Sequence, residues 1–205
     1  MKKRTDVFEN VVKCLKEDSS DIDANTPDAI GHTSLHHACA YGNLQTLKLL
    51  LTLKPNPKAL ISNGATIFHL SALNPDSNVL QHVLATYSSM VEHTPDQRGR
   101  TALHFACKHG ILENVKLLME CKEMKSFDAG NSNGSAPLHV ASLFGHDKVV
   151  QYILSQSEVK SIDIHKVNNL VQTAEDLARS RGHTKVVEAF ENFRILEYML
   201  KAINK

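Results

Sequence analysis

A short phrase that recurs at a nearly constant interval constrains this chain more than any other feature. Its four clear copies run from a glycine to a histidine and begin at Gly31, Gly64, Gly99 and Gly134. Their closing histidines, His36, His69, His104 and His139, are spaced by 33, 35 and 35 residues. A period of this length is typical of repeat architectures, in which each unit buries its apolar face against its neighbours.

A degenerate fifth copy follows, in which Asp176 replaces the histidine and Val171 stands in place of the glycine. After each phrase comes a segment with apolar residues at helical spacing, for example Val149, Val150 and Ile153. Each unit is therefore predicted to consist of two short helices. Glycines stand where the first helix must end, and a left-handed conformation is predicted for Gly42, Gly110, Gly145 and Gly182.

Turns are predicted between the units. Asp28 with Gly31, and Asp96 with Gly99, place Asp first and Gly fourth, which is the preference of a type I turn.

With this phrase, these glycines and this period, the chain resembles the ankyrin-repeat family from about Phe8 to Phe190. The resemblance implies an all-α solenoid of stacked helix-turn-helix units with inter-repeat β-turn or hairpin loops. Inner helices and loops would line a concave face, and outer helices would form the back. It also implies that the four phrase histidines hydrogen-bond to the preceding threonine and to loop backbone, so that they tie adjacent units together.

We expect residues 1–205 to form a single domain. Its predicted parts are an N-terminal half-repeat or cap (5–25), repeats at 28–60, 61–95, 96–130 and 131–167, a degenerate repeat (168–190) and a C-terminal capping helix (191–205). The half-repeat is either a cap or the remainder of a longer array. The apolar stripe of the last segment caps the stack or docks against a partner or another copy.

Composition excludes several function classes. The net charge of +1 provides no field for nucleic acid or for an anionic membrane, and the chain has no Trp and only 5% aromatic residues. Apolar stretches are far shorter than the roughly 20 residues of a membrane span, and no export signal is visible. Four scattered cysteines favour a reducing compartment. We expect a cytoplasmic monomer, with the nucleus as an alternative location.

Fragments that imitate active sites are better explained by the repeats. The GxSxG sequence at 130–134 lacks the strand before it and the helix after it that a hydrolase needs. His104, Cys107 and His109 resemble zinc ligands, but His109 would lie about 140° around the helix from His104. The sequence therefore predicts no enzyme, no cofactor and no metal site. The alternative is an enzyme with an unrecognised site.

Ankyrin repeats differ from one another at exposed positions beside the turn glycine and before the mid-unit glycine. These positions predict the partner-binding residues Tyr41, Leu73, Arg98, Arg100, Lys108, His109, Leu143 and Phe144. Aromatic and arginine side chains are favoured anchors at interfaces, and the basic residues suit an acidic segment of a partner. In the competing interpretation, Leu143 and Phe144 pack only against neighbouring helices.

The resemblance thus implies a non-catalytic protein–protein interaction module, acting as a scaffold, an inhibitor or an assembly factor. The alternative is the ankyrin portion of a larger protein, such as a channel, an enzyme or a secreted effector.

The second unit departs from the pattern. Pro75 stands where the mid-unit glycine belongs, and proline cannot adopt a positive φ. We expect the hairpin there to turn differently, with Leu73 and Asn74 pointing away from the concave face.

Overall fold

The computed structural model describes residues 23–87, 94–122, 124 and 127–203. Within them the helices pair into five units: α2 (Ser34–Tyr41) with α3 (Leu44–Leu51), α4 (Ile67–Ala72) with α5 (Ser77–Tyr87), α6 (Ala102–His109) with α7 (Leu112–Glu120), α8 (Pro137–Leu143) with α9 (Asp147–Ser155), and α10 (Ala174–Ser180) with α11 (Thr184–Ile203). The described residues contain helices and no strands, which confirms the all-α solenoid.

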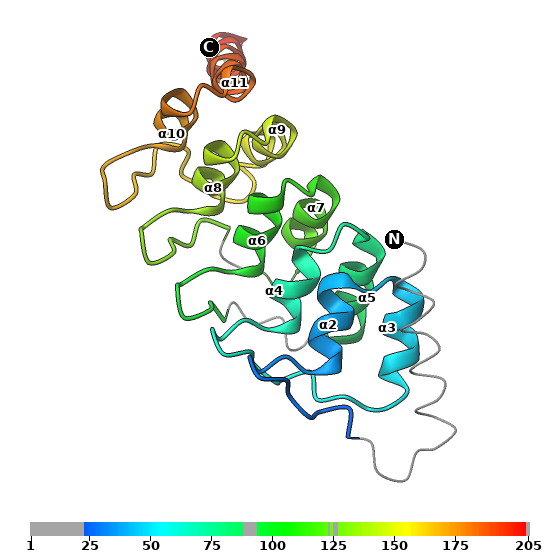
Figure 1. Ribbon diagram of the computed structural model, residues 1–205. Helices are drawn as coiled ribbons and strands as arrows, with labels where there is room; N and C mark the ends of the chain where they lie inside the picture. The colour runs from blue at the N-terminus through cyan, green and yellow to red at the C-terminus, as the bar shows by residue number, and fades with distance from the viewer. Residues whose placement is uncertain (1–22, 88–93, 123, 125–126, 204–205) are drawn as a thin grey trace.

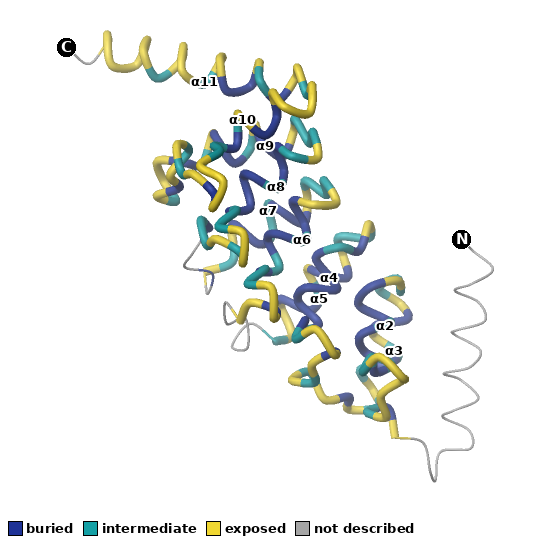
Figure 2. Tube along the Cα trace, turned by 60° about the vertical axis from the view of Figure 1, so that its left-hand side comes forward, coloured by how far each residue is buried: buried dark blue, intermediate teal, exposed yellow. Residues whose placement is uncertain are grey.

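The helices form two rows, and the inter-repeat loops project from one side of the stack (Figure 1). The inner row consists of α2, α4, α6, α8 and α10, and the outer row of α3, α5, α7, α9 and α11. Side chains buried between the rows, including Leu35, Leu80, Leu103 and Leu118, make one continuous core. Figure 2 shows buried residues running along the interior of the stack, as expected when each unit is stabilised by its neighbours.

The loops that join the units turn as predicted. The Gly31 N–H donates to the Asp28 carbonyl at 3.0 Å, and Gly99 makes the same bond to Asp96 at 2.9 Å. Neighbouring loops are also bonded to each other, since the Ser132 N–H donates to the Arg98 carbonyl at 2.8 Å. Val171 has a φ of 58° in place of the glycine of the other copies. The loop geometry is thus kept even where the glycine is lost.

The phrase histidines tie the units together, which confirms the expectation from the family. The Nδ1 of His104 lies 2.9 Å from the Thr101 hydroxyl, and its Nε2 lies 2.9 Å from the Ser135 carbonyl in the next loop. His36 and His69 make the same pair of contacts. His139 reaches the Gln172 carbonyl, although alanine replaces the threonine before it.

The prediction for the mid-unit glycines is confirmed at Gly110, Gly145 and Gly182 and is wrong at Gly42. Gly42 is extended, with φ −76° and ψ 164°. At this turn the Gly42 carbonyl accepts a hydrogen bond from Nδ2 of Asn74 at 2.8 Å. An amide from the next unit therefore organises this turn.

The side-chain amide of Asn74 also organises the turn at Pro75 in the second unit. Asn74 is buried, its Nδ2 donates to the Cys39 and Gly42 carbonyls, and its Oδ1 accepts the Asp76 N–H. Leu73 ends the helix in a right-handed conformation and packs against the core. The hairpin does turn differently, because side-chain amides replace the conformational freedom of glycine.

The two ends of the stack differ in what the structure describes. Most of the predicted half-repeat, residues 5–22, lies outside the described residues. At the other end, α11 is one continuous helix that ends at Ile203. This helix packs on the stack as far as Phe193. Beyond that point its large apolar side chains are exposed, namely Ile195, Leu196, Tyr198, Met199, Leu200 and Ile203. Among the described helices, none has both the length and the apolarity required to span a bilayer.

Candidate partner-binding surface

A pocket of about 210 Å³ opens beside the inner helices, between the third and fourth units. Its walls come from the inner helices α6 and α8, from the loops that precede them and from one residue of α10. The lining residues are Arg100, His104, Phe105, Lys108, His109, Asn131, Asn133, Ser135, His139, Val140, Leu143, Phe144 and Leu177. The pocket is therefore a joint product of adjacent repeats.

Five of the eight residues predicted to bind a partner line this pocket. They are Arg100, Lys108, His109, Leu143 and Phe144. The other three lie elsewhere, since Tyr41 is 78% exposed on the first unit, Leu73 packs against the core and Arg98 is exposed outside the pocket. The variable positions of two adjacent repeats thus converge, while those of the first two units do not join them.

Arg100 is tied to its own loop. Its Nε donates to Oδ2 of Asp96 at 2.8 Å, and its guanidinium lies 4.7 Å from the centre of the Phe105 ring. Asp96 is buried; burial alone would raise its pKa, but the hydrogen bonds from Arg100 hold the pKa below its usual value. The positive charge of Arg100 is therefore largely compensated within the protein.

The remaining polar residues set the charge of the pocket rim. Lys108 is exposed at the end of α6. Burial, together with the nearby Lys108 and His146, lowers the pKa of His109, which favours the neutral form of this imidazole. No Asp or Glu is among the described residues that line the pocket. Lys108 is thus the lining residue that presents an uncompensated positive charge.

Apolar side chains also line the pocket. Phe144 is 46% exposed and stacks against the His146 ring at 6.4 Å. Leu143 is half-buried, and its carbonyl accepts a hydrogen bond from His183 at 3.1 Å. Phe144 therefore offers much of its ring to solvent while its own backbone segment is held in place.

The histidines beneath the pocket are occupied by the framework. Burial lowers the pKa of His104 to about 4, and both its ring nitrogens have partners, as described above. Burial also disfavours the charged form of Cys107 and therefore raises the pKa of its thiol. Ser132, the central residue of the GxSxG sequence, is exposed in a loop. Its backbone N–H donates to the Arg98 carbonyl in the neighbouring loop. These groups support the framework in the geometry observed.

Phe105, Val140 and Leu177 are among the lining residues that sequence reasoning did not predict to bind a partner. Each directly follows the last residue of a phrase, at a position that is His37 in the first unit and Leu70 in the second. Comparing the copies of the repeat shows that this position varies. Variation within the array is therefore the signal that could have found these residues.

The family model for ankyrin repeats (three copies) matches residues 5–91 and 68–168. A human protein, SH3 and multiple ankyrin repeat domains protein 2, is 26% identical over 186 residues, which are 90% of this chain and 10% of that protein. The yeast (Saccharomyces cerevisiae) target of rapamycin complex 2 subunit AVO2 is 26% identical over 201 residues, 95% of this chain and 43% of that protein.

A human channel, transient receptor potential cation channel subfamily A member 1, is 31% identical over 154 residues, 72% of this chain and 13% of the channel. The chain therefore spans less than half the length of each of these relatives. The family match covers most of the chain and agrees with the stacked helix pairs. This chain belongs to the ankyrin-repeat family.

Proposed function

We propose that the chain is a non-catalytic protein-interaction module that holds a segment of a partner protein in the pocket between α6 and α8. The observation that carries this proposal is the convergence there of variable positions from two repeats, with exposed Phe144 beside Lys108. A partly exposed aromatic ring in a concave site is a typical interface anchor. The framework around it is fixed by buried histidines, so the site is preorganised.

The preferred partner segment has apolar and acidic side chains. An apolar side chain fits between Phe105, Val140 and Phe144, and a carboxylate reaches Lys108 at the rim. The absence of acidic residues among the described lining residues favours a negatively charged ligand over a positively charged one. Arg98, exposed in the adjacent loop, would extend the basic surface. Tyr41 and Leu73 are proposed as flanking contacts only for a partner long enough to reach the first two units.

The role within a larger assembly remains part of the proposal. Scaffold, inhibitor and assembly factor all require the same binding step, and one relative is named as a subunit of target of rapamycin complex 2. The relatives of this chain carry the matched repeats within longer proteins, and one of these proteins is a channel. This supports the alternative that the repeats of this chain serve a larger protein. A partner identified by binding would separate these possibilities.

The test compares a variant of the pocket with a matched variant on α9 and α11. Lys108→Glu with Phe144→Ala alters the pocket. Lys148→Glu with Tyr198→Ala likewise reverses one charge and removes one aromatic ring, but on α9 and α11, where both residues are exposed. Arg100 is left intact, because Glu at this position would face the buried Asp96 carboxylate. Affinity capture from cell extract, followed by titration of the purified partner, should show binding lost only in the pocket variant.

Circular dichroism must show that both variants fold like the wild type. Equal partner affinity in the pocket variant and the wild type would contradict the proposal.

A further inference from the structure

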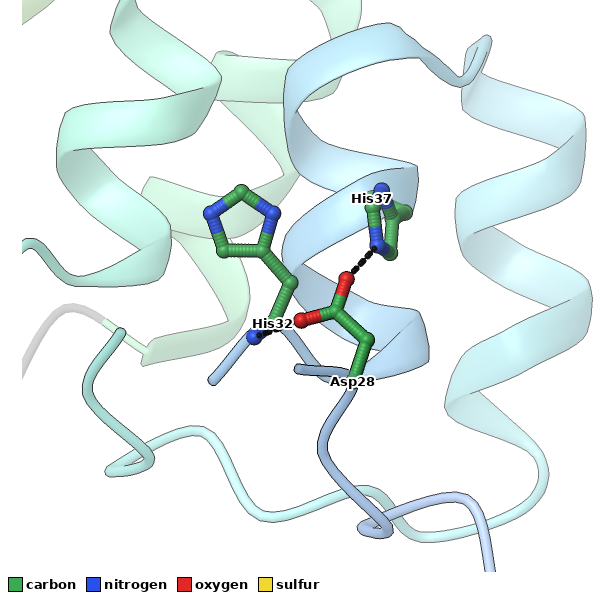
Figure 3. Close-up of side chains that lie close together, drawn as sticks. All are labelled: Asp28, His32 and His37. Carbon is green, nitrogen blue, oxygen red and sulfur yellow. Dashed lines mark hydrogen bonds and ion pairs between the residues drawn. The ribbon is translucent and has the colours of Figure 1, made fainter. Parts of the chain in front are cut away.

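Three potential metal ligands come together in the first repeat. Asp28 and His32 belong to the loop before α2, and His37 lies in the first turns of that helix. One ligand atom from each side chain lies within 4.8 Å of the others. Figure 3 shows the two imidazoles on either side of the Asp28 carboxylate. Within the described residues, this is the only group of three or more His, Cys, Asp or Glu side chains with that spacing.

The spacing suits a metal ion. The Oδ2 of Asp28 lies 3.0 Å from Nε2 of His37. Two ligands of a tetrahedral zinc ion, each about 2.0–2.1 Å from the metal, are roughly 3.3 Å apart. The centres of the His32 and His37 rings are 5.0 Å apart, and one nitrogen of each ring lies within 4.8 Å of the other and of an Asp28 carboxylate oxygen. Imidazole and carboxylate are ligands that divalent zinc accepts.

The carboxylate is held in position by the loop. The Oδ1 of Asp28 accepts the N–H groups of Ile30 at 3.0 Å and His32 at 2.8 Å. These bonds orient the other oxygen, Oδ2, toward the two histidines. Hydrogen bonds of this kind, from groups outside the ligand set, fix metal ligands in established sites. The neighbouring His36 is not available, because Thr33 and the Ala59 carbonyl occupy both of its nitrogens.

The third repeat shows what a cation does at the equivalent place. Asp96 corresponds there to Asp28, Arg100 to His32 and Phe105 to His37. The Arg100 guanidinium supplies the positive charge directly, with its Nε 2.8 Å from the carboxylate. In the first repeat two imidazoles, which are electron-pair donors when neutral, lie beside the corresponding Asp28 carboxylate.

We propose that Asp28, His32 and His37 bind a divalent transition-metal ion, with zinc as the reference metal. The three protein ligands leave one tetrahedral position for water or for a donor from another molecule. Binding replaces the hydrogen bond between His37 and Asp28 with two bonds to the metal. The site is separate from the pocket between α6 and α8 and requires no protein partner.

The test is titration of the tag-free chain with zinc chloride by calorimetry. Wild type should bind one zinc ion at this site. Asp28→Asn removes the charged ligand and keeps the loop, because Asn131 and Asn168 accept the same backbone N–H groups in the fourth and fifth repeats. This variant should weaken binding by about 10-fold to 100-fold or more. His165→Ala, at an exposed histidine in a later loop, should leave binding unchanged.

A double variant, His32→Arg with His37→Phe, reproduces the third repeat and should fold normally and bind no zinc at this site. Shifts of the His32 and His37 ring-nitrogen signals on zinc addition would identify the ligands in the wild type. Wild-type affinity in the Asp28→Asn and double variants would place the ion elsewhere and overturn the proposal. The absence of binding by wild type at about 0.1 mM zinc would also overturn it.

Discussion

The joint between the second and third repeats is built differently from the joints that follow. At the former, Nδ2 of Asn114 on α7 donates to the Ala72 and Asn74 carbonyls, at 3.0 and 2.8 Å, beside the Pro75 turn. At the next joint, the Nε2 of His146 lies 2.9 Å from the Lys108 carbonyl, beside a left-handed glycine. Both arrangements satisfy carbonyls at the end of an inner helix.

This difference teaches that the stack needs a donor at each joint more than it needs a particular turn residue. Asn114 is completely buried, whereas His146 is half-buried. A buried carbonyl left without a donor costs more free energy than one that water can reach. The two joints should therefore respond unequally when their donors are removed.

Loss of the Asn114 amide has the largest expected effect. Asn114→Ala leaves the Ala72 and Asn74 carbonyls without this donor in the interior and should lower the free energy of unfolding by about 2–4 kcal/mol. Urea denaturation measures the change. Asn78→Ala, at an exposed asparagine of α5, is the control and should change stability by less than about 0.5 kcal/mol. Equal losses in the two variants would remove the distinction between buried and accessible donors.

Acid should weaken the histidine ties along the whole array. The pKa of His104 falls from its ordinary value to about 4 on folding, so between pH 6.5 and 4 the unfolded chain binds more protons than the folded one. Stability from this group is complete above pH 6.5 and decreases as the pH falls toward 4. From pH 7.5 to 5 the loss is about 2 kcal/mol for His104 alone. Burial lowers the pKa of His36, His69 and His139 in the same direction.

Urea midpoints across this pH range would measure the dependence. A His104→Asn variant, already less stable at pH 7.5, should lose less stability on acidification than the wild type. An identical pH dependence in the two proteins would show that His104 does not contribute to it.

Removal of the imidazole at the accessible joint should have a smaller effect than removal of the buried amide. His146→Ala deletes the bond to the Lys108 carbonyl and the contact with Phe144, and should cost about 1 kcal/mol. Thermal unfolding compared with Asn114→Ala sharpens the contrast between the joints. A loss as large as that of Asn114→Ala would mean that burial does not determine the cost.

Restoration of the missing turn glycine should produce a small gain. Val171 has a φ of 58°, which is unfavourable for a β-branched residue. Val171→Gly should add about 0.5–1 kcal/mol after the greater entropy of the unfolded glycine chain is subtracted. The reverse change, Gly134→Val at a φ of 71°, should be destabilising. If Val171→Gly lowered the thermal midpoint, apolar contacts of Val171 would outweigh its strain.

Features that recur in every copy of the repeat could be predicted from the sequence, whereas those peculiar to one joint could not. The phrase histidines are specified by the period, and their bonds follow from the family framework. The Gly42 conformation depends on Asn74, which belongs to the next unit, and a general rule for glycine gave the wrong answer.

The pocket was partly predictable for the same reason. Its rim residues Lys108 and Phe144 occupy variable positions that the sequence identifies. The pairing of Arg100 with Asp96, and the approach of His37 to Asp28, both require the folded loop to bring a side chain back onto its carboxylate. Spacing alone directed attention to His104 and Cys107, which are buried in the framework.

The most direct test of the account is hydrogen exchange of the chain, measured by mass spectrometry with and without the partner obtained by affinity capture. The account predicts slower exchange of peptides covering 97–109 and 131–144, which contain the pocket rim, with little change in α7 and α9. Protection confined to the outer helices or to the exposed end of α11, with 97–109 and 131–144 unchanged, would contradict binding in the pocket between α6 and α8.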